Sequence, residues 1–374
     1  MKNSVLFLTF ISFPYWALCQ NLNNVTSWAY QLQNLDIVQV AADTSFQLVV
    51  MDYSADGTDD TKYAATDISQ IKNSGKKAIS YISIGEAEDY RYYWQTSWNS
   101  NPPAFLGAEN PDWAGNYKVR FWDTAWQSTV FGYIDTIIAQ GFDGIYLDII
   151  DAYYYWQTEN PEQPLADSLM VQFVLNIRQH VDAAHPGSRF FILPQNGEEI
   201  IESNNVSPQL AQLYLGAIDG VGIEDVFFSG NADMDNPHSP DGYRLTILQH
   251  YQQVGKKVFN IEYISQSAKI NQYEQDIQQY GFVPYYCVRN LDQLCGQPTW
   301  VGIPTANETP KLVFSDGRLS LSSQERITSL HLIDIMGRTV AEHENVSLSG
   351  LPPGIYWAKV TLGEKYHILS VAIY

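Results

Sequence analysis

The feature that most constrains this chain is a repeated alternation of strand-like and helix-like stretches. Helical spacing of apolar residues marks Thr124–Gln140, Leu165–Ala184 and Asp241–Val254, and a glycine of the kind that caps helices follows some of these patterns, as at Gly141 and Gly255. Between such patterns lie short runs rich in β-branched and aromatic residues, as expected for strands. The eight predicted strands are Ser27–Gln31, Phe46–Asp52, Lys77–Ser83, Gly144–Leu147, Arg189–Pro194, Gly220–Glu224, Lys257–Glu262 and Phe282–Tyr286.

Eight alternating units in roughly 260 residues predict a closed (β/α)8 TIM barrel. An open doubly wound sheet is the alternative. Such a sheet normally carries a glycine-rich phosphate turn after its first strand, and this sequence has no such turn.

Two long loops, Glu86–Tyr117 and Asp151–Gln163, follow the carboxyl ends of predicted strands, where barrel enzymes build their sites. Both are rich in Tyr and Trp, whose flat faces pack on sugar rings and whose polar atoms reach hydroxyls. One subset of these aromatics has near-helical spacing, which favours packing in the core instead. That subset is Trp94, Trp98, Trp122 and Trp126.

Strand alternation predicts which carboxylates face the barrel lumen. In the fourth strand, Ile145 and Leu147 are the aliphatic residues expected against the outer helices, so Asp148 points inward at the strand's end. The same reasoning turns Ile223 outward and Glu224 inward at the end of the sixth strand. Two carboxylates that converge on one pocket are the minimum needed to cleave a glycosidic bond. We therefore expect Asp148 and Glu224 to be the catalytic pair.

Further residues are expected to hold substrate or to orient this pair. Asp52 and Glu262 close the second and seventh strands, and Tyr146 shares the inward parity of Asp148. Asp225 faces away from Glu224, and ion pairing is the expected role of Arg120 and Arg289. At most one of Trp28 and Tyr30 is expected to reach the lumen. The expected substrate-binding set is Asp52, Tyr81, Glu86, Tyr146, Asp151, Asn196, Glu262 and Tyr286.

The two ends of the chain differ from its middle. Residues 1–19 combine Lys2, a short apolar run and Ala17-Leu18-Cys19, which is the pattern of a signal peptide; a lipid anchor on Cys19 is disfavoured because Leu18 precedes it. Residues 20–295 form the predicted barrel domain and 296–310 a proline-containing linker. Residues 311–374 alternate like a small antiparallel β-sandwich. Cys287 and Cys295 either form a disulfide or remain two buried thiols.

The C-terminal residues resemble the sorting domain of type IX secretion cargo. The matching segments are 332–338 (LIDIMGR) and 346–356 (VSLSGLPPGIY). The resemblance implies recognition by the type IX secretion machinery, passage through the periplasm, and release or attachment at the cell surface. No internal apolar run is long enough to span a membrane.

The predicted barrel resembles glycoside hydrolase family 114, the endo-α-1,4-polygalactosaminidases. The segments that carry the resemblance are 81–91 (YISIGEAEDYR), 141–151 (GFDGIYLDIID), 222–225 (GIED) and 281–285 (GFVPY). The resemblance implies an α-linked galactosamine-containing polymer as substrate and no metal or other cofactor. It also implies Asp148 as nucleophile and Glu224 as general acid/base.

The charge balance fits that substrate. The chain has 41 Asp and Glu against 21 Lys and Arg, which attracts a cationic polymer and disfavours nucleic acid. Three other readings stay open: a barrel that binds polysaccharide without cutting it, a hydrolase of another α-linked polymer, and a deacetylase. The last usually needs a His-rich metal site. His180, His185, His238 and His250 all lie away from the predicted strand ends. We expect a monomer.

Overall fold

The computed structural model describes residues 22–295 and seven strands between Lys311 and Ile373. It divides into two compact units, Met1–Thr299 and Trp300–Tyr374, which are described separately. The predicted signal peptide (1–19) and linker (296–310) lie outside the described residues. No helix among the described residues is long and apolar enough to cross a membrane.

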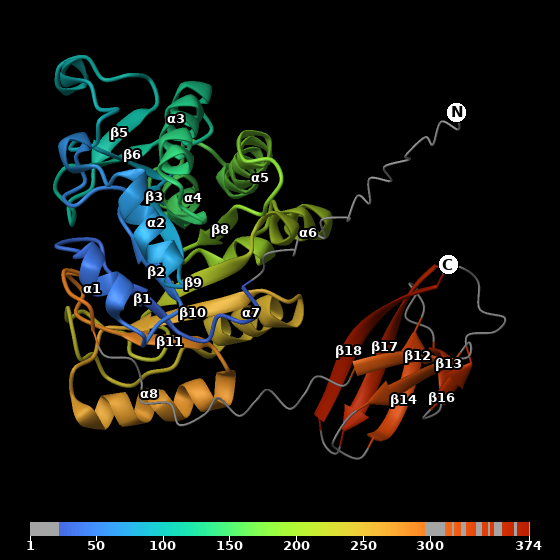
Figure 1. Ribbon diagram of the computed structural model, residues 1–374. Coiled ribbons are helices and arrows are strands. Elements are labelled where there is room, and N and C mark those ends of the chain that lie inside the picture. Colours follow the sequence, from blue (N-terminus) through green and yellow to red (C-terminus); the bar gives the residue numbers. More distant parts are fainter. Residues whose placement is uncertain are drawn as a thin grey trace, which may run out of the picture. The chain divides into compact units, whose positions relative to one another are not determined.

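The first unit is an α/β fold whose central strands are parallel, and all eight predicted strands are present (Figure 1). One sheet has the order β1-β2-β3-β7-β8 and a second has the order β11-β10-β9. The strands of the two sheets are β1 (Trp28–Tyr30), β2 (Leu48–Met51), β3 (Lys77–Ser83), β7 (Gly144–Asp148), β8 (Phe191–Pro194), β9 (Gly220–Glu224), β10 (Lys257–Glu262) and β11 (Val283–Tyr286).

Two sets of contacts join the sheets into the order of a barrel. A parallel bridge between Gln195 and Gly222 connects the end of β8 to β9. On the other side, the Trp28 indole Nε1 donates a hydrogen bond of 3.0 Å to the Val283 carbonyl and so connects β1 to β11. The strand order and these two contacts between the sheets agree with the (β/α)8 barrel that the sequence predicts.

Helices follow the strands and cover the outside of this unit (Figure 1). α3 begins and ends where the apolar spacing predicts, and Gly141 caps it in the left-handed region at φ 90°. Its buried residues Val130, Ile134 and Ile137 form one face against the sheet. The helices are α1 (Ile37–Ala42), α2 (Ala65–Asn73), α3 (Thr124–Gln140), α4 (Ala152–Tyr154), α5 (Ala166–Ala184), α6 (Pro208–Ala217), α7 (Gly242–Gln253) and α8 (Ser267–Tyr280), with short turns η1 (Asp59–Thr61), η2 (Thr96–Asn99), η3 (Tyr155–Glu159) and η4 (Glu198–Glu202).

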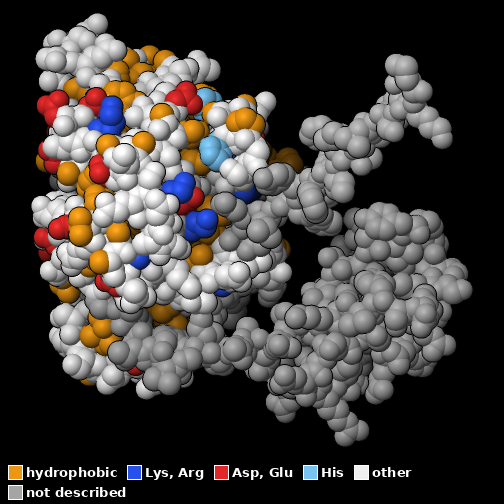
Figure 2. Space-filling view, viewed as in Figure 1, with side chains coloured by type: hydrophobic (Ala, Val, Ile, Leu, Met, Phe, Trp, Pro, Cys, Tyr) orange, Lys and Arg blue, Asp and Glu red, His pale blue; other side chains and the backbone are white. Residues whose placement is uncertain are grey.

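The long loop after β3 folds into a small antiparallel sheet of its own. β6 (Asn116–Val119) lies between β4 (Glu86–Glu88) and β5 (Leu106–Glu109). Trp98 and Trp126 are buried beside it, so the prediction of core packing holds for these two tryptophans. The insert adds a wall above the carboxyl end of β3. In Figure 2, acidic side chains of this unit gather along the left edge of the view, and Lys and Arg are scattered.

The last part of the chain contains antiparallel strands, as predicted for it. They pair in the orders β12-β13-β16 and β15-β14-β17-β18. Their arrangement as a sandwich stays a prediction. These strands are β12 (Lys311–Ser315), β13 (Arg318–Ser322), β14 (Ile327–Ile333), β15 (Thr339–Glu342), β16 (Asn345–Ser347), β17 (Gly354–Leu362) and β18 (Lys365–Ile373).

Candidate active site

Asp148 and Glu224 lie at the carboxyl ends of two strands that are separated by a single strand. Asp148 is the last residue of β7 and Glu224 is the last residue of β9, with β8 between them. Both side chains line one cavity of about 540 Å³, which also includes Tyr81 and is called the Tyr81 cavity below. Strand alternation therefore predicted the position of this pair correctly.

Asp148 is held by two donors. The Tyr81 hydroxyl donates a hydrogen bond of 2.7 Å to Oδ2, and the Ile149 backbone N–H donates one of 2.9 Å to Oδ1. Burial raises the pKa of Asp148 to about 8; the charge of Glu224 adds to this shift and the Tyr81 bond opposes it. Below about pH 8 the Asp148 carboxyl therefore keeps its proton in most molecules.

Glu224 is also held by two donors, one for each carboxylate oxygen. The Asn196 side-chain amide donates to Oε1 at 2.8 Å, and the Tyr263 hydroxyl donates to Oε2 at 2.7 Å. Tyr263 was not predicted from the sequence, because it lies one residue beyond the predicted end of its strand. Its lumen-facing parity follows once Phe259 and Ile261 are assigned to the lumen.

The backbone leaves each of these strands through a left-handed residue. Ile149, Asn196 and Asp225 have φ values of 61°, 54° and 53° and directly follow Asp148, Gln195 and Glu224. A β-branched residue such as Ile149 is strained in this region. Gly85 makes the turn possible on the neighbouring strand, because a Cβ there would lie 2.2 Å from the Ile149 carbonyl oxygen. Asp148 and Glu224 thus sit on tightly turned, closely packed backbone.

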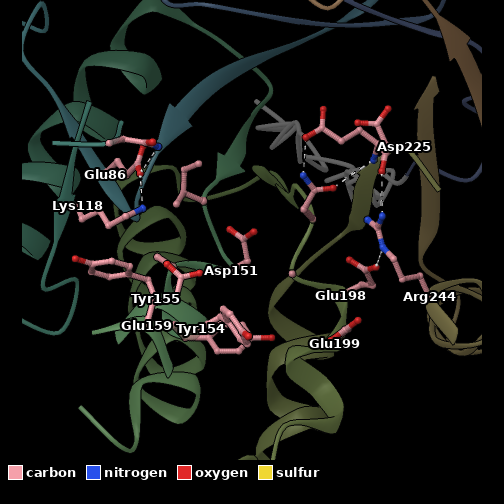
Figure 3. Close-up of a pocket in the computed structure, with 17 residues that line it drawn as sticks. Glu86, Lys118, Asp151, Tyr154, Tyr155, Glu159, Glu198, Glu199, Asp225 and Arg244 are labelled. Carbon is pink, nitrogen blue, oxygen red and sulfur yellow. Dashed lines mark hydrogen bonds and ion pairs between the residues drawn. The ribbon is translucent and has the colours of Figure 1, made fainter. Parts of the chain in front are cut away.

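A second cavity of about 550 Å³ adjoins the first and is called the Tyr155 cavity below (Figure 3). Both cavities are lined by the same five residues at their common border. These residues are Glu86, Ile149, Asp151, Asn196 and Glu224. Glu224 thus faces both spaces, whereas Asp148 lines only the Tyr81 cavity. A ligand longer than one sugar ring can extend from one cavity into the other across Glu224.

An aromatic cluster fills the lumen beneath the pair. Trp28 and Tyr30 stack with ring centroids 6.0 Å apart, and Tyr146 lies 5.2 Å from Tyr30. The prediction that at most one of Trp28 and Tyr30 faces the lumen is wrong, because residues two apart in a strand share a face. Gly222 leaves room for Tyr146, since a Cβ there would lie 1.8 Å from the Tyr146 hydroxyl oxygen.

Tyr146 is not on the surface of either cavity, which corrects its predicted role in binding substrate. Its side chain is fully buried. Burial raises the pKa of Tyr146, and the charges of Glu224 and Asp148 add to this shift. Tyr146 belongs to the aromatic cluster that fills the lumen.

Glu262 and Tyr286 were also predicted to bind substrate, and the structure places both on the side of the sheet that faces away from the lumen. The parallel register pairs Ile261 with Glu224, so Glu262 points to the opposite side, and Tyr286 is paired with Glu262. Neither residue lines the Tyr81 cavity or the Tyr155 cavity. Glu262 is fully buried and accepts hydrogen bonds from the backbone N–H groups of residues 226–228, at 2.9 to 3.2 Å. It fixes the segment that follows Glu224 and does not contact substrate space.

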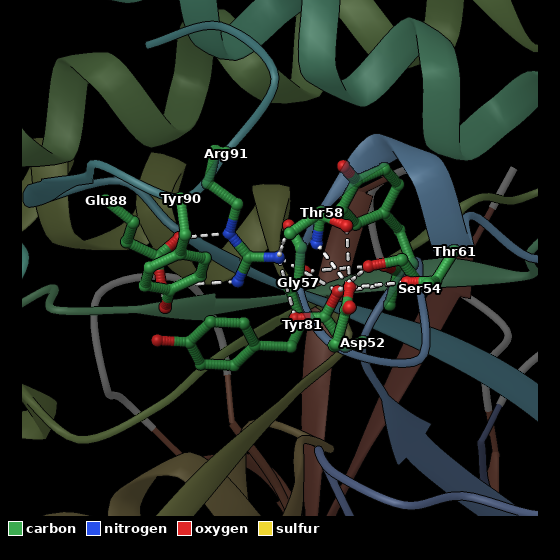
Figure 4. Close-up of polar contacts among 12 residues, drawn as sticks. Asp52, Ser54, Gly57, Thr58, Thr61, Tyr81, Glu88, Tyr90 and Arg91 are labelled. Atoms are coloured by element: carbon green, nitrogen blue, oxygen red, sulfur yellow. Dashed lines mark hydrogen bonds and ion pairs between the residues drawn. The ribbon is translucent and has the colours of Figure 1, made fainter.

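Asp52 lines the Tyr81 cavity, yet its carboxylate is committed to a buried ion pair (Figure 4). Arg91 contacts Asp52 at 2.8 Å and Glu88 at 2.6 Å, and the Tyr90 hydroxyl donates to Glu88 at 2.6 Å. The side chains of Arg91 and Glu88 are each 1% exposed. This cluster joins β2 to the insert after β3. No role for Arg91 was predicted from the sequence.

The other predicted substrate-binding residues do line the cavities. Glu86, Asp151 and Asn196 border both, and Tyr81 borders the first. Exposed aromatic rings stand at separate places around them: Trp113 and Tyr90 at the Tyr81 cavity, and Tyr154 at the Tyr155 cavity. These rings provide flat apolar faces of the kind that sugars pack against.

The remaining candidates have structural partners. Arg120 pairs with Glu162 at 2.8 Å, and Arg289 pairs with Asp225 at 2.8 Å, as expected for both arginines. Cys287 and Cys295, left open by the sequence, form a disulfide. Among the described residues, no group of His, Cys, Asp and Glu has the geometry of a metal site.

Parallel strands in barrel order, with two carboxylates at one mouth and tyrosines beside them, define a glycoside hydrolase. Comparison with known proteins gives the particular family. Residues 14–299 match the model of glycoside hydrolase family GH114, and the chain belongs to that family. Uncharacterized proteins of Methanocaldococcus jannaschii and Thermotoga maritima are similar to it. The first is 37% identical, over 74% of this chain and 80% of the relative, and the second is 33% identical, over 78% and 91%.

Two solved structures share the fold. One is Ega3 of Aspergillus fumigatus in complex with galactosamine, with 17% identity and a TM-score of 0.52 over 72% of this chain and 95% of that one. The other is the glycoside hydrolase domain of PelA from Pseudomonas aeruginosa, with 16% identity and a TM-score of 0.55 over 72% and 97%. At these identities the likeness concerns the fold.

Proposed function

We propose that this glycoside hydrolase cleaves α-1,4-linked polysaccharide that contains galactosamine, with Asp148 as nucleophile and Glu224 as general acid/base. One observation carries the proposal: both carboxylates end barrel strands and line the same cavity, and a tyrosine hydroxyl donates to each. That arrangement supplies an acid and a nucleophile on either side of one sugar linkage.

In the first step, Glu224 donates its proton to the glycosidic oxygen while an Asp148 oxygen attacks C1. The bond from C1 to the glycosidic oxygen breaks, the leaving sugar departs with a new hydroxyl, and an ester joins C1 to Asp148. In the second step, Glu224 takes a proton from water as that water attacks C1, and the ester bond breaks. Asp148 returns as a carboxylate and the released sugar keeps its anomeric configuration.

The hydrogen bonds around the pair fit these roles. Tyr81 and the Ile149 N–H donate to Asp148, and such donors stabilise the negative charge that Asp148 must carry before it attacks and recover after the ester breaks. Asn196 and Tyr263 hold both oxygens of Glu224, so its carboxyl keeps one orientation in both steps.

The charge of the cavities supports a cationic substrate. Carboxylates outnumber basic side chains around both cavities, and the whole chain carries a formal charge of −20. A polymer of galactosamine with free amines is positively charged, so it is attracted to these walls. Ega3, which shares this fold, has been solved in complex with galactosamine.

The two adjoining cavities support cleavage inside a chain rather than at its end. Sugars on one side of the cleaved bond would occupy the Tyr81 cavity, and those on the other side would occupy the Tyr155 cavity. Trp113 and Tyr154, which are 60% and 54% exposed, provide stacking surfaces at the two cavities. This arrangement favours an endo-acting enzyme.

The experiment that tests this function incubates the full chain with a panel of α-linked polymers, some with and some without galactosamine. Asp148→Asn and Glu224→Gln serve as matched variants, since each replaces a carboxylate by an amide of the same shape. Products are sized by mass spectrometry. We expect the wild type to give short oligosaccharides from galactosamine polymers only and both variants to give none. Identical product profiles for all three proteins would contradict the assignment.

We also propose that the protein is an exported monomer. The proposal rests on the signal-like residues 1–19 and on the resemblance of residues 311–374 to type IX sorting domains. Export through the periplasm by that machinery predicts a mature N-terminus near Gln20 and a protein found in the medium or on the cell surface. Mass spectrometry of the protein recovered from each fraction tests this, and a full-length cytoplasmic protein would contradict it.

A further inference from the structure

The Tyr155 cavity has an unusual excess of carboxylates. Its lining contains seven acidic residues and two basic ones, Lys118 and Arg244. Both basic side chains are already paired, Lys118 with Glu86 at 3.2 Å and Arg244 with Glu198. The acidic residues are Glu86, Asp151, Glu159, Glu198, Glu199, Glu224 and Asp225. The cavity therefore repels an anionic sugar and favours a cationic one.

Asp151 is the acidic residue of this group that stands beside the catalytic pair without a partner. Its side chain is exposed, and within residues 22–295 it forms no ion pair and accepts no hydrogen bond from another side chain. Figure 3 shows its carboxylate in the middle of the cavity, between Tyr155 on one side and Glu198 on the other. It borders both cavities, as Glu224 does.

Glu86 is a second carboxylate on the cavity wall, and its two oxygens differ in their contacts. It is 2% exposed and lines both cavities. Its Oε1 accepts hydrogen bonds from Asn110 at 2.9 Å and from Lys118 at 3.2 Å, whereas its Oε2 has no partner among the described residues. A buried carboxylate oxygen without a donor is costly, and a cation held near the carboxylate lowers that cost.

The positions of Asp148 and Glu224 indicate which cavity holds the sugar that is attacked and which holds the leaving sugar. Asp148 lines only the Tyr81 cavity, so the sugar whose C1 is attacked belongs there. Glu224 also faces the Tyr155 cavity, and the acid/base must reach the oxygen of the leaving sugar. The leaving sugar therefore enters the Tyr155 cavity, where Asp151 and Glu86 stand next to Glu224.

We propose that Asp151 and Glu86 form a subsite that binds the ammonium group of the sugar on the leaving side of the cleaved bond. The proposal rests on the function proposed above and specifies how that site selects its substrate. The ammonium contacts the open carboxylate of Asp151, and the buried Glu86 carboxylate adds negative charge from the cavity wall. An N-acetylated leaving sugar has no charge to offer there, so it binds less tightly and leaves the Asp151 carboxylate without a cation.

The test uses two synthetic disaccharides of galactosamine joined α-1,4, one with a free amine on the leaving sugar and the other with that amine acetylated. For the full-length wild type we expect kcat/KM to be about tenfold higher or more for the free amine, as for a hydrogen bond to a charged group. In Asp151→Asn this preference falls to about twofold or less, since one charge of the pair is gone. The Glu86→Gln variant reduces the preference as well.

The matched control is Asp60→Asn, because Asp60 is exposed, has no ion pair and lies outside both cavities. It should keep the preference of the wild type. A structural role for Asp151 would reduce turnover of both disaccharides equally, so an unchanged preference in Asp151→Asn overturns the subsite while the proposed function stands. A wild type that cleaves neither disaccharide nor the galactosamine polymer overturns both proposals.

Discussion

The hydroxyl of Tyr263 donates a hydrogen bond of 2.7 Å to Oε2 of Glu224, from the residue that directly follows β10. Tyr263 is 3% exposed, and the Arg289 guanidinium lies 4.0 Å from its ring centre. Arg289 in turn pairs with Asp225, the neighbour of Glu224. Tyr263, Arg289 and Asp225 thus form a continuous set of contacts around Glu224, which holds its carboxyl in one orientation.

Replacement of Tyr263 by Phe should lower kcat by about tenfold to a hundredfold, because hydrogen bonds to charged groups contribute about 1.5–3 kcal/mol. Steady-state kinetics on a galactosamine oligomer measure this change. Tyr286→Phe is the control, since Tyr286 faces away from both cavities, and we expect its kcat within twofold of the wild type. Equal kcat values for Tyr263→Phe and the wild type would contradict the role given to the hydrogen bond.

The pH dependence of kcat/KM should show an acidic limb near pH 8. Burial raises the pKa of Asp148 to about 8, and Asp148 must lose its proton before it attacks C1, so kcat/KM falls as pH decreases below that value. Tyr81→Phe removes a hydrogen bond that lowers this pKa, so the limb should move to higher pH. A pH–rate profile of the two proteins checks both statements, and a limb that moves to lower pH in the variant would contradict the second.

Asp148→Asn should make the folded protein more stable, although it inactivates the enzyme. The pKa of Asp148 is about 8 in the folded state and about 4 in an unfolded chain, so the native state binds the proton more tightly. The wild type therefore loses stability as pH rises from about 4 to 8, and the variant avoids that loss. Because the carboxyl is partly exposed, we expect a gain of about 2 kcal/mol at pH 8.5 and none at pH 3.5. Denaturant unfolding at both pH values measures it, and equal gains would be inconsistent with the raised pKa.

Removal of Arg91 should destabilise the fold strongly. Arg91→Met leaves Asp52 and Glu88 buried without their cation, which typically costs about 3–5 kcal/mol. Lys62→Met is the control, because its pair with Asp59 is solvent-exposed and should contribute about 1 kcal/mol or less. Urea unfolding of the three proteins gives both differences. Similar losses for the two variants would show that the buried cluster has no special role.

Much of the fold could be predicted from sequence because the strands and helices have strong local patterns. The catalytic pair followed from β7 and β9, where Ile145, Leu147 and Ile223 mark the outward face clearly. The same reasoning failed for β10, where the apolar residues Phe259 and Ile261 face the lumen and Glu262 faces outward. The lumen of this barrel is partly an aromatic core, so apolar residues do not mark only the outer side.

The errors at Glu262 and Tyr286 have a physical cause that lies far away in the chain. Glu262 can be buried on the outward face because the backbone N–H groups of residues 226–228 bind its carboxylate. No local sequence pattern predicts that these backbone N–H groups will bind Glu262. The same is true of Arg91 and Lys118, which reach the site only because the insert after β3 folds back as β4 and β6.

The most direct test of the central claim is the mass of Glu224→Gln after reaction with an aryl α-galactosaminide whose leaving group needs no protonation. The first step then proceeds, whereas the second lacks its base, so the sugar ester accumulates. We predict one added sugar on the peptide that contains Asp148 and none when Asp148→Asn is also present. A sugar attached to another carboxylate would contradict the account, as would release of the aryl group with no sugar bound to the protein.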